Sequence, residues 1–289
     1  MVDHFLFGNS YRNSPEANIP IITPSHEYST PGGSGNVAFN LASLGAKVSC
    51  VGVIGDDNWG QMLLKLLNKK SIDTSKIIKS VEYPTTLKKR VYLDDINICR
   101  IDNEKKLNNS INDLINNNVN KVIKNYDIVI LSDYNKGVLN EQTIQNAIRH
   151  SKAPVIVDPK KEDFSIYKGA NILTPNIEEL DKALNLETND NSSIISACRN
   201  LVNENNFEYI VNTRGSKGIT VVGKDLTEEV KTTPISNADV TGAGDTVVSV
   251  LSLAYFKTND IIQSARIANK AGKSIVSKKG TAVIELEEI

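Results

Sequence analysis

The chain has 289 residues, of which 40% are hydrophobic and 23% charged, and its formal net charge at pH 7 is −1. This length allows one large α/β domain or two small ones, and the balanced charge gives no support to a nucleic-acid or anionic-membrane partner. No apolar run is long enough for a membrane span, the first 20 residues are too polar for a signal peptide, and the cysteines (Cys50, Cys99 and Cys198) lack metal spacing. We therefore expect a cytoplasmic protein with reduced thiols.

The first third of the chain contains two segments that do not fit an α/β alternation. Residues 8–31 are rich in proline around the short apolar run IPIIT, and residues 85–101 predict two strands joined at Asp94 and Asp95. We predict that these two segments together form a small separate sheet that projects from the main domain.

A Gly-Gly turn lies between these segments, in PGGSGNVAFNLASLGAKVSCVGVIGDDNWG (31–60). At Gly32 and Gly33 the backbone could closely approach a polyhydroxylated ligand. Asn36, at the start of the helix predicted next, offers both a donor and an acceptor to sugar hydroxyls. A tight turn before a helix explains the same residues without a ligand.

The rest of the chain alternates short apolar strands with amphipathic helices. Strands are predicted at 47–54, 126–132, 154–158, 171–174 and 209–213, and each is a nearly continuous apolar run, as in strands buried on both faces. Residues 110–126 predict a helix, because their apolar residues recur at spacings of three and four despite many asparagines. This alternation predicts a mostly parallel sheet covered by helices.

Two polar motifs follow predicted strands. Asn176 and Glu179, in TPNIEEL, share a helix face at a strand end, where open α/β sheets bind ligands. The same spacing is common in solvated first turns of helices. The loop TRGSKG (213–218), taken by itself, also fits an ordinary hairpin turn.

The stretch NADVTGAGDTVVSV (237–250) carries a chemical signal. Gly242 and Gly244 favour a turn, and the apolar residues after them predict a buried helix. The first amides of that helix, at the positive end of its dipole, would bind phosphate. Asp245 would repel this anion unless it had a task, such as accepting a proton from an attacking hydroxyl. An aspartate at this place also fits a plain N-cap.

Four segments resemble, in order, the signatures of the ribokinase-like (PfkB) carbohydrate kinases: 31–60, TPNIEEL, TRGSKG and DVTGAGDT. The resemblance implies a three-layer α/β fold over residues 1–289, with a mostly parallel central sheet, helices on both faces and a small β lid at 8–31 and 85–101. Some relatives are fused to an adenylyltransferase domain. Its H-x-G-H motif does not occur in this sequence, so we expect a single kinase domain.

The resemblance also implies roles for individual residues. Asp245 would be the general base, and the transferred phosphoryl group would be stabilised by the amides of Gly242, Ala243 and Gly244. ATP phosphates and Mg²⁺ would be organised by Asn176 and Glu179, the latter through water. The nucleotide would be lined by Thr213, Gly215, Gly218 and Asn269, and the sugar would be bound by Asp3, Gly32, Gly33 and Asn36.

Further stretches resemble the heptose kinase branch of the family, among them SPEANIPI (14–21), LSDYNKGVL (131–139) and VDPK (157–160). They imply phosphorylation of O1 of D-glycero-β-D-manno-heptose 7-phosphate, a step towards ADP-heptose for the lipopolysaccharide core. Candidate cations for the substrate's own phosphate are Lys88, Arg90, Lys136 and Lys160. Lys88 and Arg90 share a strand face, which suits a paired phosphate contact or, equally, a solvated edge strand. The alternatives are a PfkB kinase for another sugar or nucleoside, and an inactive sugar-binding relative.

Family members carry an apolar strand ending in Gly-Asp before the segment that VDHFLFG resembles. Met1 stands where that strand should finish, so we expect the first central strand to be missing. The family's lid can pair between subunits, so a homodimer is also expected.

Overall fold

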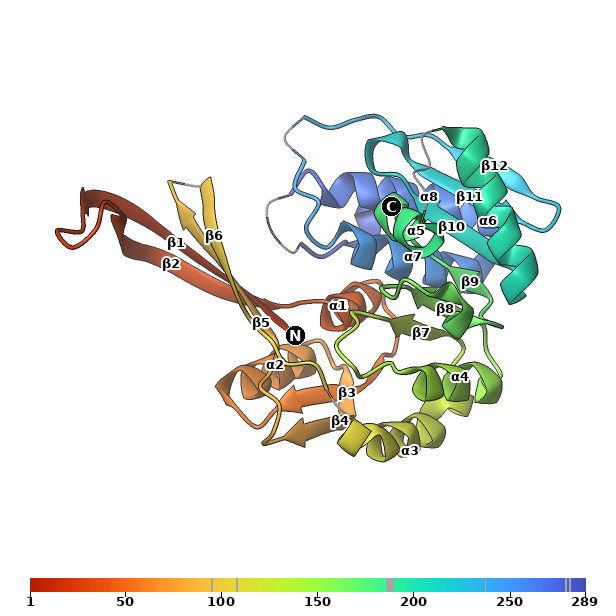
Figure 1. Ribbon diagram of the computed structural model, residues 1–289, viewed down its shortest axis with the longest axis horizontal. Helices are drawn as coiled ribbons and strands as arrows, with labels where there is room; N and C mark the ends of the chain where they lie inside the picture. The colour runs from red at the N-terminus through yellow and green to blue at the C-terminus, as the bar shows by residue number, and fades with distance from the viewer. Residues whose placement is uncertain (95, 108, 186–189, 237, 279, 281) are drawn as a thin grey trace.

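The computed structural model describes residues 1–289 except 95, 108, 186–189, 237, 279 and 281 (Figure 1). A six-stranded sheet forms its centre, in the order β12-β11-β10-β9-β8-β7. Its strands are β7 (Val129–Ser132), β8 (Val155–Asp158), β9 (Ile172–Leu173), β10 (Tyr209–Thr213), β11 (Ile219–Gly223) and β12 (Thr227–Val230). β7 to β10 run parallel to one another, and β11 runs antiparallel to its neighbours β10 and β12, so the mostly parallel sheet is confirmed. The strands predicted at 126–132, 154–158, 171–174 and 209–213 belong to it, whereas the strand predicted at 47–54 lies in another sheet and β11 and β12 were not predicted.

Helices cover both faces of this sheet. Neighbouring residues of a strand point to opposite faces, so each buried strand contributes side chains to two cores. Val155 and Val157 pack into a core with α3 (Asn112–Val122), α4 (Glu141–His150), α5 (Ile177–Leu184) and α6 (Asn191–Asn205). Ile156, between them, packs into a second core with α1 (Ser34–Ser43), α7 (Ala243–Thr258) and α8 (Ile261–Ile275). The predicted three layers are therefore present.

Short 3₁₀ helices account for the remaining turns of helix. The helix predicted at 110–126 is α3 with a 3₁₀ turn at each end, η1 (Asn109–Ile111) and η2 (Ile123–Asn125). The others are η3 (Phe164–Tyr167), η4 (Gly215–Lys217) and η5 (Leu286–Glu288).

A second, two-stranded sheet of β3 (Ser49–Gly55) and β4 (Asp73–Ser80) lies beside β7, with α2 (Asn58–Lys69) connecting its strands (Figure 1). Its residues Val51, Val53 and Ile78 pack against the core that α3 and α4 share with the main sheet. Among the described strands none pairs with both β3 and β7.

A four-stranded sheet, which we call the lid, projects from the body (Figure 1). Its order is β2-β1-β5-β6, with β1 (Val2–Asn13), β2 (Pro20–Pro31), β5 (Leu87–Leu93) and β6 (Ile96–Asn103). The predicted separate sheet is therefore present, but it starts at Val2 and not at residue 8. The cause is pairing: Val2 lies opposite both Pro31 of β2 and Leu87 of β5, so the ladder begins at the root of the lid.

Within the described ranges, no helix is long and apolar enough to cross a membrane. Cys50, Cys99 and Cys198 are free thiols.

A buried ionic network ties the end of β7 to the segment after β8. The Asp133 carboxylate, which is 3% exposed, accepts hydrogen bonds from Lys161 Nζ and from the Tyr167 hydroxyl, both at 2.7 Å. Its second oxygen accepts the amide N–H of Asn135 at 2.7 Å. Because a buried carboxylate needs such partners, this network fixes the loop that follows β7.

Lys161→Met keeps the length of the side chain but leaves the Asp133 carboxylate without its cation. We expect the free energy of unfolding to fall by about 3 kcal/mol, because breaking a buried pair leaves an uncompensated charge. Tyr167→Phe removes one neutral donor from the same carboxylate and should cost about 1.5 kcal/mol. Urea denaturation followed by circular dichroism measures both changes. Equal losses in the free energy of unfolding for the two variants would contradict the larger contribution expected from the Lys161–Asp133 ion pair.

Candidate active site

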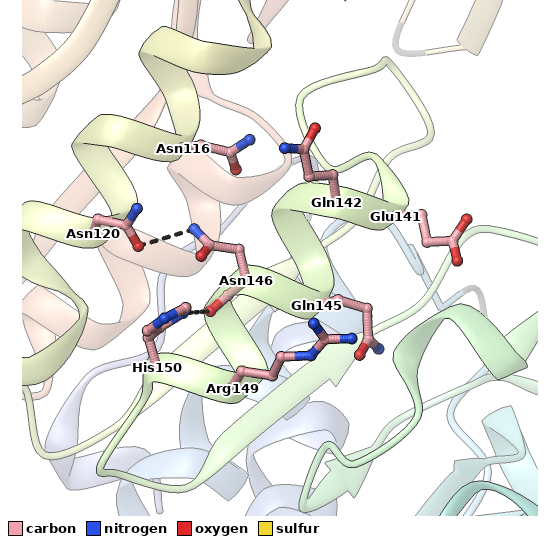
Figure 2. A pocket seen from close by; sticks show the side chains of 8 residues that line it. All are labelled: Asn116, Asn120, Glu141, Gln142, Gln145, Asn146, Arg149 and His150. Carbon is pink, nitrogen blue, oxygen red and sulfur yellow. Dashed lines mark hydrogen bonds between the residues drawn. The ribbon is translucent and has the colours of Figure 1, made fainter.

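Two cavities compete as the functional site. The larger, about 480 Å³, lies between α3 and α4 and is lined mainly by amide side chains, including Asn116 and Gln142 (Figure 2). None of the residues singled out in the sequence lines it. The smaller, about 190 Å³, lies where β7, β8, β9 and β10 end, and seven predicted site residues line it: Lys160, Asn176, Glu179, Thr213, Gly242, Gly244 and Asp245. The smaller cavity is therefore the candidate active site.

The start of α7 forms an anion cradle beside this cavity. Gly242 has a left-handed backbone (φ 77°) and precedes the helix, which has no side-chain cap. Among the described residues, no protein acceptor is found for the amide N–H of Gly242 or Gly244, whereas the N–H of Ala243 donates to the Val240 carbonyl at 3.2 Å. A Cβ at Gly244 would meet nothing within 4 Å. Two of the three predicted amides thus remain available, and Ala243 is already engaged in the turn.

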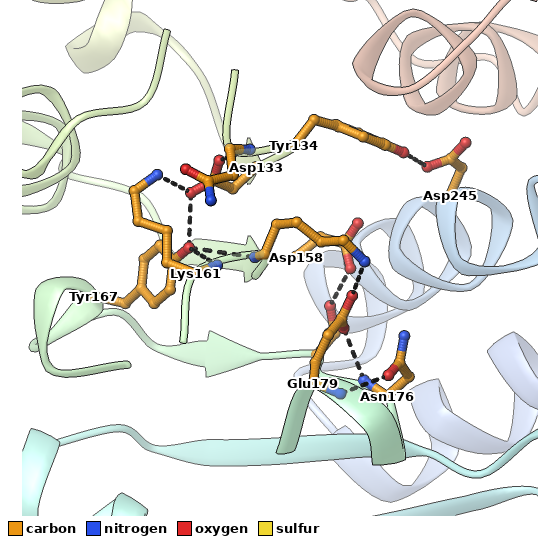
Figure 3. A network of polar contacts seen from close by, with 11 residues as sticks. Asp133, Tyr134, Asp158, Lys161, Tyr167, Asn176, Glu179 and Asp245 are labelled. Atoms are coloured by element: carbon orange, nitrogen blue, oxygen red, sulfur yellow. Dashed lines mark hydrogen bonds and ion pairs between the residues drawn. The ribbon is translucent and has the colours of Figure 1, made fainter. Parts of the chain in front are cut away.

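The Asp245 carboxylate lies at the wall of the cavity and is 7% exposed. Asn36 Nδ2 donates to its Oδ2 at 2.8 Å. The hydroxyl of Tyr134 donates to its Oδ1 (Figure 3). Burial raises the pKa of Asp245 to about 6, while these two hydrogen bonds act in the opposite direction. Such a carboxylate is ionised at neutral pH and can still accept a proton, as a general base must.

The Gly-Gly turn is filled by protein atoms. A Cβ at Gly32 would lie 2.3 Å from Oδ2 of Asp3, and a Cβ at Gly33 would lie 3.0 Å from the ring of Tyr134. Gly33 also has a positive φ of 57°. Glycine at these positions therefore makes room for the side chains of Asp3 and Tyr134, where the sequence suggested close approach of a ligand.

Asn176 and Glu179 lie at the opposite wall. They form a capping box at the start of α5: Glu179 N–H donates to Asn176 Oδ1 at 2.9 Å, and Asn176 N–H donates to Glu179 Oε2 at 3.0 Å. The other oxygen, Oε1, pairs with Lys160 Nζ at 2.9 Å. These residues therefore begin a helix and also line the cavity, and their contact with a ligand stays a prediction.

The acidic lining suits a cation that arrives with its own ligands. Burial raises the pKa of Asp158 well above its usual range, and the charges of Asp245 and Glu179 raise it further. In the part of the chain that the structure describes, no group of three or more His, Cys, Asp or Glu side chains could hold a metal ion by itself. Mg²⁺ usually takes one or two carboxylates together with water and substrate phosphates. The side chains therefore fit Mg²⁺ carried by a nucleotide.

The TRGSKG segment forms the hairpin between β10 and β11. Thr213 lines the cavity, but Gly215 and Gly218 do not. A Cβ at Gly218 would lie 2.1 Å from the Val230 carbonyl oxygen, so this glycine permits close packing of backbone. Asn269 is likewise outside the cavity lining, and its Nδ2 donates to the Lys231 carbonyl at 3.0 Å. Their nucleotide contacts stay predictions.

The four predicted substrate cations lie in different surroundings. Arg90 pairs with Asp3 at 2.7 Å at the root of the lid, Lys136 pairs with Glu104, and Lys160 pairs with Glu179. Lys160 therefore belongs to the wall predicted for Mg²⁺ and ATP. Lys88 lowers the pKa of Asp245 through its charge, and it has no ion-pair partner among the described residues. It remains available for a phosphate.

Sequence reasoning missed six of the residues that line this cavity, and three of them, Asp133, Tyr134 and Asp158, carry acidic or phenolic groups. A signal for them existed, since Asp133 follows β7 directly and Asp158 ends β8. The carboxyl ends of parallel strands meet at one edge of a sheet, which is where open α/β sheets bind ligands.

Comparisons with known proteins identify the family of the chain. The profile described as pfkB family carbohydrate kinase matches residues 6–288. The bifunctional protein HldE is 36% identical over 294 residues in Mesorhizobium japonicum, 38% over 294 residues in Sulfurimonas denitrificans and 36% over 295 residues in Helicobacter pylori strain J99. These alignments cover 100% of this chain but 59%, 61% and 64% of the relatives. The chain thus spans less than two thirds of their length.

Solved structures share the fold. Phosphofructokinase-2 from Escherichia coli, in complex with substrates and products, has a TM-score of 0.82 at 19% identity, covering 99% of this chain and 94% of that one. Ribokinase from Thermotoga maritima has a TM-score of 0.75 at 18% identity, covering 99% and 95%. The ribokinase-like architecture is therefore confirmed. Since the family profile also spans almost the whole chain, the chain belongs to the pfkB family of carbohydrate kinases and is an ATP-dependent sugar kinase.

Proposed function

We propose that residues 1–289 act as one kinase domain that transfers a phosphoryl group from ATP to O1 of D-glycero-β-D-manno-heptose 7-phosphate. The observation that carries the proposal is the Asp245 carboxylate, buried at the cavity wall next to the unpaired amides of Gly242 and Gly244. The resemblance to the heptose kinase branch and the HldE relatives support the choice of sugar.

When bound, ATP supplies the phosphoryl group and Mg²⁺ neutralises part of its charge. The protein's own part is positioning and electrostatics. The N–H groups of Gly242 and Gly244 donate to the oxygens of the moving group, and the helix dipole of α7 adds to their effect. Glu179, aligned by Asn176 and Lys160, would hold Mg²⁺ through water.

Asp245 accepts the proton of the sugar hydroxyl as the new O–P bond forms. Asn36 keeps one carboxylate oxygen in place from α1. At the root of the lid, Asp3 is held by Arg90 and accepts hydrogen bonds from the other sugar hydroxyls. Lys88, on the same strand face as Arg90, receives the phosphate that the substrate already carries.

Asp245→Asn should lower kcat by about 10²–10⁴-fold, the usual contribution of a positioned base, because an amide cannot take the proton. Binding of ATP, measured by calorimetry, should persist. Asp260→Asn is the matched control, since Asp260 caps α8 outside the cavity and asparagine also caps helices. Turnover of Asp245→Asn close to that of the control would refute the assignment.

Substrate choice is tested with a panel of sugars at equal concentration: heptose 7-phosphate, fructose 6-phosphate, ribose and adenosine. We expect the highest kcat/KM for heptose 7-phosphate, and Lys88→Met should raise its KM about tenfold by removing one charged hydrogen bond, worth about 1.5 kcal/mol. Lys89→Met is the control, because Lys89 points to the other face of β5. Preference for another member of the panel, or equal effects of the two variants, would exclude this substrate or this contact.

We also propose that two copies pair through their lids. All eight residues of β6 are exposed, and three of them are apolar and large, Ile96 (68% exposed), Ile98 (44%) and Ile101 (54%). An edge strand with exposed apolar side chains is a site where another chain can pair.

The expected species in sedimentation velocity is a dimer, and the double change Ile96→Glu with Ile101→Glu should convert it to a monomer by placing like charges on the pairing face. Val81→Glu, at a residue that is 89% exposed outside the lid, should leave the dimer intact. A monomeric unmodified chain would refute lid pairing without affecting the kinase assignment.

A further inference from the structure

The Asp245 carboxylate is held from two sides. Asn36, on α1, donates to Oδ2, and Tyr134, in the loop after β7, donates through its hydroxyl to Oδ1 (Figure 3). The two donors belong to separate parts of the chain, so together they fix both the position and the rotation of the carboxylate plane. A carboxylate oxygen has two lone pairs, and each oxygen here has one left for the acceptor alcohol.

Tyr134 itself is rigidly mounted. The residue before it, Asp133, is bound by Lys161 and Tyr167, and the amide of Asn135, the residue after it, donates to the same Asp133 carboxylate. The backbone N–H of Asp133 also donates to the Asp158 carbonyl at 2.9 Å. On the other side, the ring packs on Gly33, where any Cβ would approach it to 3.0 Å. The phenol therefore has little freedom to leave Asp245.

The chemistry of the pair suits a fixed donor. Burial raises the pKa of Tyr134 well above its usual value, and the negative charges of Asp245 and Asp158 raise it further. The phenol consequently keeps its proton at any pH at which the enzyme works. It can donate a hydrogen bond, and it cannot act as a second base.

We propose that Tyr134 is a positioning residue of the phosphoryl transfer, which holds the ionised carboxylate of Asp245 so that its free lone pairs face the acceptor alcohol. This inference rests on the proposed function of Asp245 as the base. It gives the loop after β7 an indirect part in catalysis, through Asp245, and it explains why a buried ionic network lies under a loop at the cavity edge.

The pH dependence of kcat/KM should therefore depend on the hydroxyl of Tyr134. Asp245 works only when ionised, so kcat/KM should rise with pH through a pKa of about 6. The groups that act on this pKa are Asn36 and Tyr134, which lower it by hydrogen bonding, Lys88 on β5, which lowers it by charge, and Asp3 on β1, which raises it. Asp158 adds a further acid across the cavity. Removal of the Tyr134 hydroxyl should therefore raise the pKa and move the acid limb to higher pH.

The experiment compares Tyr134→Phe with the unmodified enzyme over pH 5–9. We expect the acid limb of kcat/KM to move up by about one pH unit, which gives about tenfold lower activity near pH 5.5 and a much smaller loss above pH 8. Tyr255→Phe is the matched control. Tyr255 lies on the same helix as Asp245 but outside the cavity, and its hydroxyl also contacts a carboxylate, Glu208 Oε2 at 3.4 Å. Its acid limb should coincide with that of the unmodified enzyme, which also controls for titration of the substrate's phosphate.

A measurement without turnover protects the test against a variant that folds poorly. Carbon-13 NMR of aspartate-labelled protein follows the Asp245 carboxyl carbon directly, assigned by its loss in Asp245→Asn, and its pKa should rise in Tyr134→Phe. An unchanged acid limb together with an unchanged carboxyl pKa would overturn the inference. Faster turnover in Tyr134→Phe would also overturn it, since the phenol would then be blocking the base. If Asp245→Asn stays fully active, the proposed function fails; if it is inactive and Tyr134→Phe is unaffected, this inference alone fails.

Discussion

The structure depends on keeping one buried carboxylate ionised. Asp245 sits at the start of α7 with little contact to water, a position that favours the protonated form. The amide of Asn36, the phenol of Tyr134 and the positive end of the helix oppose this tendency. The Gly-Gly turn, the loop after β7 and the helix start all serve that one balance, so residues far apart in the sequence have a common task.

The fold could largely be predicted from the sequence. Its central strands are short, nearly continuous apolar runs, and their length distinguishes them from the longer amphipathic helices. The helix start at Gly242 could be predicted for a similar reason, since a small-residue turn before an apolar run has few other structures open to it. The lid start was wrong by six residues. Residues 2–7 contain the apolar residues of a core strand, and nothing local shows that β1 pairs outwards with β2 and β5.

The candidate site was predictable only for residues that lie within one short sequence motif. Asp245, Asn176 and Glu179 meet this condition. Tyr134 does not, because its partner Asp245 is 111 residues away and no spacing rule links them. The sugar contacts of Gly32 and Gly33 stay predictions, and the packing of Asp3 and Tyr134 against these glycines could not be seen in the sequence, because the partners lie far away along the chain. The charge of Lys160 can be read from the sequence, which suggested a sugar contact. Its ion pair with Glu179 cannot be read from the sequence.

The continuity of β2 with the Gly-Gly turn has a mechanical consequence. The strand ends at Pro31, and Gly32, Gly33 and then α1 follow without a linker. Any swing of the projecting arm must therefore bend the backbone at the two glycines, directly against the Tyr134 ring and one turn from Asn36. This connection has no slack, so a change in the angle of the lid at this point would be transmitted to the residues that hold the Asp245 carboxylate.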